Sequence, residues 1–193
     1  VRITKSFYVS ATEVTQEQYQ ALMDVSPSRF AGRQSPVECV SWNDAHEFCR
    51  KLSAKIGQEF RLPTEAEWEY ACRAGTQTAF SFVDDEEGLE DYAYYGENSG
   101  GRTHPVGQKK PNAWGLYDMH GNVWEWCADR FDWDYYNASP PADPKGCSSG
   151  VSRVLRGGSW FNAPSSSRSA NRHFNPPSLR SSDFGFRVVA VPE

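Results

Sequence analysis

Three runs of hydrophobic residues at helical spacing occupy the first 75 positions of the chain. Each run opens on a hydroxyl residue that can cap a helix, namely Thr15, Ser41 and Thr64. Gly57 and Gly75 stand where the second and third runs stop, as glycine does after many helices. The spacing therefore predicts three helices in the N-terminal part of the chain.

Shorter apolar stretches make up the rest of the pattern. Residues 1–13 alternate loosely and predict an opening strand or two, and later stretches predict further strands at Val123–Trp126, Val151–Leu155 and Phe184–Val191. From about Thr76 onward the chain is rich in loop-forming residues and includes an acidic loop at 84–91, which lacks the ligand pattern of a calcium loop. We expect one mixed α+β domain over residues 1–193, with many loops.

Composition and charge exclude several classes of protein. A net charge of −5 without a basic block disfavours a nucleic-acid partner. No apolar run approaches the roughly 20 residues of a membrane span. The five cysteines are an odd number without CxxC spacing, which argues against a zinc knuckle and against complete disulfide pairing. The chain begins at Val1 without a visible signal peptide, so we expect a trimmed or mature domain.

The segment RLPTEAEWEY at 61–70 is dense in carboxylates, which can indicate catalysis. Helix capping and ion pairs one helical turn apart, such as Glu69 with Arg73, explain it more simply. The histidines are scattered and support neither a metal site nor an acid–base pair: His46, His104, His120 and His173. We therefore interpret the carboxylates as structural and each histidine as a surface histidine or one whose hydrogen bonds are satisfied.

The segment GNVWEW at 121–126 places two indoles two residues apart. In an extended strand Trp124 and Trp126 would share one face, and Glu125 would point the other way, toward an arginine. This pattern is typical of a core strand with one buried ion pair.

Four motifs occur in order along nearly the whole chain: RLPTEAEWE at 61–69, GLYDMHGNVWEW at 115–126, RGGSW at 156–160 and GFR at 185–187. Together with EVTQ at 13–16 and PVECVSW at 36–42, they resemble the formylglycine-generating-enzyme (sulfatase-modifying factor) family. The resemblance implies the C-type-lectin-like fold of that family, which agrees with a loop-rich α+β domain.

A departure from the family's pattern argues against its enzymatic activity in this chain. Its enzymes carry a pair of cysteines shortly after the RGGSW-like motif, which bind copper and activate oxygen. Asn162 and Ser167 stand at the corresponding places here and offer no thiolate. We expect a protein that is not an enzyme and requires no cofactor.

A calcium ion is the one metal that the resemblance leaves open. The family's second calcium site resembles Asp118 with the backbone around Met119, Gly121 and Val123. One carboxylate and several carbonyl groups suit a hard cation. An ordinary turn stabilised by Asp118 is the alternative.

The segment 161–184 has an unusual composition. It contains no Lys, Glu, Gln, Trp or Met, although these types make up about a fifth of the remaining residues. They are also the types that cannot arise when the adenines of an asparagine codon are randomised. Adenine-directed mutagenesis marks diversity-generating retroelements, whose variable proteins use this lectin-like fold, in one treponemal case in its formylglycine-enzyme version. The chain resembles such proteins; a serine-rich loop under ordinary drift is the alternative.

A variable region at 153–187 would combine a fixed frame with displayed side chains. The frame residues are Arg153, Gly157, Gly158, Trp160, Gly185 and Arg187. The positions predicted to bind ligand are Phe161, Asn162, Ala163, Ser165, Ser166, Ser167, His173, Phe174, Asn175, Ser178, Leu179, Ser181, Ser182 and Asp183. Aromatic anchors among small hydroxyl residues resemble antibody paratopes.

We therefore expect a ligand-binding protein that recognises a protein or cell-surface ligand, itself at the cell surface or extracellular. Two alternatives stay open. One is an accessory or regulatory module of a larger protein. The other is a metal-dependent oxidase of the same family that works without the cysteine pair, which would need a histidine cluster from elsewhere.

Overall fold

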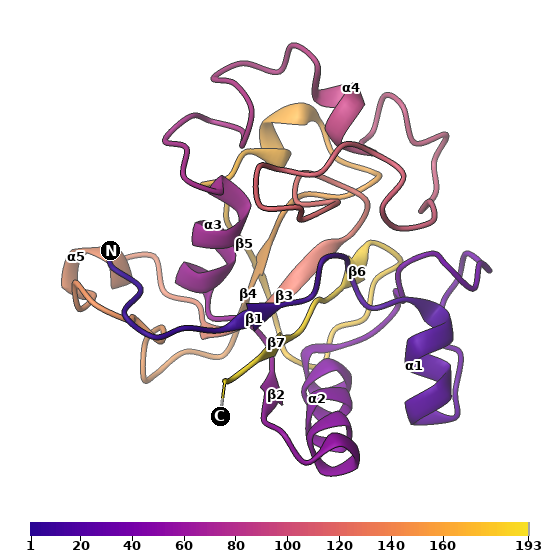
Figure 1. The fold of residues 1–193 in the computed structure, drawn as a ribbon, viewed down its shortest axis with the longest axis horizontal. Helices are drawn as coiled ribbons and strands as arrows, with labels where there is room; N and C mark the ends of the chain where they lie inside the picture. The colour runs from indigo at the N-terminus through magenta and orange to yellow at the C-terminus, as the bar shows by residue number, and fades with distance from the viewer. Residues whose placement is uncertain (193) are drawn as a thin grey trace.

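The computed structural model describes residues 1–192 (Figure 1). The helices are α1 (Gln16–Met23), α2 (Trp42–Ile56), α3 (Glu65–Arg73), α4 (Leu89–Tyr92) and α5 (Tyr135–Ala138), with one 3₁₀ turn, η1 (Pro164–Ser167). The strands are β1 (Tyr8–Val9), β2 (Phe60–Arg61), β3 (Trp124–Arg130), β4 (Arg153–Arg156), β5 (His173–Asn175), β6 (Phe184–Gly185) and β7 (Val189–Ala190). Figure 1 shows α1 and α2 at one end of the molecule and the long loops around α4 at the other.

The three predicted helices are confirmed as α1, α2 and α3. The hydroxyl groups of Thr15, Ser41 and Thr64 each accept a hydrogen bond from the backbone N–H three residues later. Helix α2 ends at Gly57 with φ +84°, whereas α3 ends one residue before its glycine, on Ala74 in the left-handed conformation. Because a capping residue lies at the start of each helix, the local sequence is enough to predict where the three helices begin.

Two small sheets form the centre of the molecule, with strand orders β1-β7-β2 and β5-β4-β3-β6. All pairs are antiparallel except β3 with β6, which run parallel. The apolar stretches at 123–126, 151–155 and 184–191 are confirmed as strands, while β2 and β5 were not predicted. Both are two or three residues long, too short to show a period.

Aromatic packing dominates the largest core cluster. The ring of Phe48 stacks on Tyr19 with centroids 5.6 Å apart and meets the edge of Phe186 at 5.3 Å. Trp126 is fully buried beside them and donates its indole N–H to the carbonyl of Val40 at 3.0 Å. Helices α1 and α2 are thus fixed against β3 and the C-terminal segment.

A buried ion pair joins β3 to the C-terminal segment. As predicted, Trp124 and Trp126 enter one core cluster, and Glu125 points away from them to an arginine, Arg187. The Arg187 Nε lies 2.7 Å from Glu125 Oε2, both side chains have no exposed area, and the Trp68 indole donates to the same oxygen at 2.7 Å. Removing one member of such a pair typically costs about 3–5 kcal/mol.

All five cysteines are free in the structure. Within residues 1–192 no helix has both the length and the apolar character needed to cross a membrane.

Candidate functional site

An open basin of about 460 Å³ lies where η1, β5 and the loop before β6 meet. Six of the predicted ligand-binding residues line it: Phe161, Asn162, Ser166, His173, Ser181 and Asp183. The other lining residues, which the sequence analysis did not select, are Trp124, Asn171, Arg172 and Phe184. The basin therefore brings together residues from both ends of the segment 161–184.

The indole of Trp124 and a network of hydrogen bonds fix the wall of the basin. Asn162 Oδ1 accepts from Trp124 Nε1 at 2.8 Å and from Ser159 Oγ at 2.6 Å. An indole N–H can only donate, so this oxygen is assigned without ambiguity and the Asn162 amide nitrogen is left as a donor. Asp183 accepts from Ser181 beside it.

His173 contributes a neutral imidazole to the same wall. Its ring lies 5.1 Å from that of Trp124, and burial lowers its pKa below the usual value. Asn175 Nδ2 donates to its Nε2 at 2.9 Å, which places the proton on Nδ1. The basin thus presents amide and imidazole donors beside the carboxylate of Asp183.

Scaffold groups hold the main chain of the segment through its carbonyl oxygens. His120 Nδ1 donates to Ser167 O at 2.8 Å, and Arg156 donates to Ser169 O at 2.9 Å and to Asn171 O. Further scaffold groups bind the carbonyl oxygens of Asn162, Pro177, Ser181, Ser182 and Asp183. Most of these contacts do not involve the side chains of the segment.

Most predicted positions reach the surface. Five are exposed: Phe161, Ala163, Ser165, Ser178 and Leu179. Seven are half-buried at the basin or beside it: Asn162, Ser166, His173, Asn175, Ser181, Ser182 and Asp183. The remaining two, Ser167 and Phe174, occupy different surroundings.

The prediction of a displayed side chain is wrong for Ser167. This residue ends η1 with its side chain turned inward and has no exposed area. Its Oγ packs against the main chain of Gly158, close enough that a Cβ at Gly158 would lie 2.6 Å from it. Ser167 therefore belongs to the frame.

Phe174 also differs from its predicted role as a displayed anchor. It lies between His173 and Asn175 on the three-residue edge strand β5, so its side chain points to the opposite face of the sheet. There its ring stacks on Phe131 with centroids 4.0 Å apart and packs against a core cluster. Phe174 is therefore a half-buried packing residue and does not line the basin.

The basin does not fit copper. Neither Asn162 nor Ser167 offers a thiolate, the Asn162 oxygen already accepts two hydrogen bonds, and Ser167 is buried. None of the residues that line the basin is a cysteine.

The predicted calcium position retains one suitable ligand. Asp118 is buried; its Oδ2 accepts the N–H of Gly107 at 2.8 Å, and its Oδ1 has no hydrogen-bond partner among residues 1–192. Burial raises the pKa of Asp118 to about 6. In the same range no group of three or more His, Cys, Asp or Glu side chains could hold a metal. Calcium binding by Asp118, Met119, Gly121 and Val123 stays a prediction.

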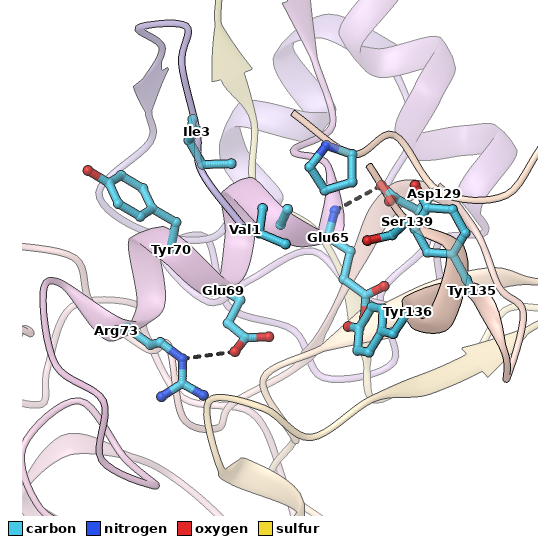
Figure 2. A pocket seen from close by; sticks show the side chains of 12 residues that line it. Val1, Ile3, Glu65, Glu69, Tyr70, Arg73, Asp129, Tyr135, Tyr136 and Ser139 are labelled. Atoms are coloured by element: carbon cyan, nitrogen blue, oxygen red, sulfur yellow. Dashed lines mark hydrogen bonds and ion pairs between the residues drawn. The ribbon is translucent and has the colours of Figure 1, made fainter. Parts of the chain in front are cut away.

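A second hollow, of about 480 Å³, lies beside α3 and α5 and involves none of the predicted ligand-binding residues. Figure 2 shows the predicted pair of Glu69 with Arg73, whose Nε and Oε1 are 2.8 Å apart. It also shows Asp129, whose Oδ2 accepts the Glu65 N–H at 2.8 Å. Burial, together with the charges of Glu65 and Glu67, raises the pKa of Asp129 to about 7.

Comparison with known proteins identifies the fold and the family of this chain. The Major Tropism Determinant U1 variant shares the fold alone, with a TM-score of 0.55 and 18% identity over 96% of this chain and 50% of that one. The class is the C-type-lectin-like fold in its formylglycine-generating-enzyme form. A family model described as "Sulfatase-modifying factor enzyme 1-like domain" matches residues 1–191, and the chain belongs to that family.

Two relatives represent the two kinds of protein that this chain resembles, an enzyme and a variable protein. The formylglycine-generating enzyme of Streptomyces coelicolor is 40% identical over 178 residues, 84% of this chain and 55% of the enzyme. The chain thus spans about half the length of that relative. The structure titled "Treponema denticola variable protein 1" matches with a TM-score of 0.95 and 38% identity over 100% of this chain and 86% of that one.

Phe174→Ala should destabilise the protein by about 2–3 kcal/mol, because it removes a ring packed on Phe131. His173→Ala is the matched control on the neighbouring position and should cost less than about 1 kcal/mol. Urea unfolding followed by fluorescence measures both. Equal costs at the two positions would contradict the assignment of the two side chains to opposite faces.

Asp129→Asn should change how stability depends on pH. The folded-state pKa of Asp129 is raised, so its stabilising contribution is complete below pH 4 and is lost as the pH rises toward 7. Relative to Asp129→Asn, the wild type should therefore lose roughly 2–4 kcal/mol of unfolding free energy between pH 4 and pH 8. Parallel pH profiles in urea unfolding would show that this carboxyl titrates normally.

Proposed function

We propose that this chain is a variable protein, in the sense of a diversity-generating retroelement product, which binds a protein or cell-surface ligand through the segment 161–184. The observation that carries the proposal is the way scaffold donors hold this segment by its carbonyl oxygens while twelve of the predicted side chains reach the surface. Main-chain hydrogen bonds are indifferent to side-chain identity, so sequence can change without loss of the loop conformation.

The likeness to Treponema denticola variable protein 1 over the whole chain supports this function. The basin is open and mixed in polarity, and Phe161 beside it is 70% exposed. An exposed aromatic ring among small hydroxyl side chains suits contact with a protein surface better than enclosure of a small molecule. Such a ligand would be met at the cell surface or outside the cell.

The protein acts, in this proposal, without catalysis. The copper chemistry of the family's enzymes depends on thiolates, and the positions in question carry an amide bound by Trp124 and a buried hydroxyl. No cofactor is then required, and calcium at Asp118 would serve stability alone.

Sequencing the DNA that encodes residues 61–75 and 153–193 from many isolates of the source tests the proposal. We expect substitutions concentrated at the exposed positions Phe161, Ala163, Ser165, Ser178 and Leu179. Ser167 is the matched control, a serine of the same segment that is buried and should stay constant.

Residues 61–75, which are outside the segment, give the background rate of change. A segment that varies no more than this background would contradict the proposal, and an accessory module of a larger protein would then be the better interpretation.

A further inference from the structure

Trp133 is an exposed indole held on a rigid aromatic base. Its side chain is 76% exposed, yet its ring meets the edges of Phe131 at 5.0 Å and Phe174 at 5.4 Å. Those two rings are stacked on each other. An aromatic side chain that is ordered before binding loses little conformational entropy when a partner covers it, which is the property of an interface anchor.

Arg172 connects this indole to the basin. It lines the basin, and its guanidinium also lies 4.7 Å from the ring centre of Phe131 and 4.2 Å from that of Tyr136. Glu65 holds it with contacts of 2.6 and 2.8 Å. The basin and Trp133 therefore lie on the two sides of the edge strand β5, and a partner that covers this edge contacts both.

Two carboxylate residues, Asp132 and Asp134, stand on either side of Trp133 in the sequence. Asp132 Oδ1 accepts the N–H of Asp134 at 2.7 Å, and neither residue forms an ion pair within the described part of the chain. The positive charge of Arg172 is already matched by Glu65. An exposed indole whose two neighbours in the sequence are carboxylates without an ion-pair partner suits a lysine or arginine side chain, by cation–π attraction and by charge-assisted hydrogen bonds.

We propose that the ligand-binding surface extends from the basin across β5 to Trp133, where a lysine or arginine of the partner protein lies on the indole between Asp132 and Asp134. The inference rests on the proposed function, since it takes the partner to be the protein bound by the basin. Trp133 lies outside the diversified segment, so this contact stays constant while the basin changes. It supplies binding energy common to all variants and restricts the partner to surfaces with a basic residue.

The full chain is immobilised and used to select from a phage-displayed library of random twelve-residue peptides. Enriched peptides are synthesised, and their Kd is measured by fluorescence anisotropy against the wild type and variants. We expect each peptide to carry a lysine or arginine. Trp133→Ala should weaken binding at least about tenfold, as for an interface anchor, and the double change Asp132→Asn with Asp134→Asn by about three- to tenfold.

Val151→Ala is the matched control, since Val151 is 86% exposed in the same β3–β4 connection and should leave Kd unchanged. Replacing the peptide's arginine by citrulline, which is neutral and of similar shape, should weaken binding as much as Trp133→Ala. A Kd for Trp133→Ala within about twofold of the wild type overturns the inference.

Phe161→Ala separates this inference from the proposed function. Peptides that depend on Phe161 but not on Trp133 would leave the basin as the binding site and remove the extension. Peptides that depend on neither residue would contradict both.

Discussion

The binding of main-chain carbonyl groups by two buried side chains is the constraint on which the C-terminal surface depends. Arg156 has no exposed area, lies over the ring of Trp68 at 5.3 Å, and donates to the carbonyls of Ser169 and Asn171. His120 donates from Nδ1 to Ser167 O, because the N–H of Ser81 occupies its Nε2 at 3.1 Å. Burial lowers the pKa of His120 to about 4, so the ring stays neutral and keeps this arrangement near pH 7.

This arrangement separates two requirements that usually conflict in a loop, a fixed backbone conformation and changeable side chains. The scaffold holds the segment largely through backbone carbonyl groups, with side-chain links such as Asn162 to Trp124 and Arg172 to Glu65, and in the proposed function the exposed side chains vary. The scaffold is itself held by the buried pair of Glu125 and Arg187, which also contacts the carbonyls of Ser10 and Tyr117 and so joins both ends of the chain to β3. Strands of two to seven residues suffice because these side-chain links replace long backbone ladders.

The sequence correctly predicted the features that depend on neighbouring residues in the chain. Capping residues located α1, α2 and α3, and the alternation of Trp124, Glu125 and Trp126 assigned each side chain to its correct face. The basin was predicted only in part, because the direction of a side chain in a three-residue strand depends on its neighbours in space. Phe174 was misplaced for that reason, and Ser167 because η1 turns it toward Gly158. The role of His120 left no local signal, since its acceptor lies 47 residues away.

The most direct test of the separation between backbone and side chains is a stability measurement on two libraries. One randomises Phe161, Ala163, Ser165, Ser178 and Leu179 together; the other randomises Ser167 alone. Yeast display with protease challenge measures the fraction folded in each. We predict that most members of the first library stay folded, whereas side chains larger than serine at position 167 cost about 1–3 kcal/mol by overpacking. Unfolding of the first library as often as the second would contradict the claim that the loop conformation does not depend on the exposed side chains.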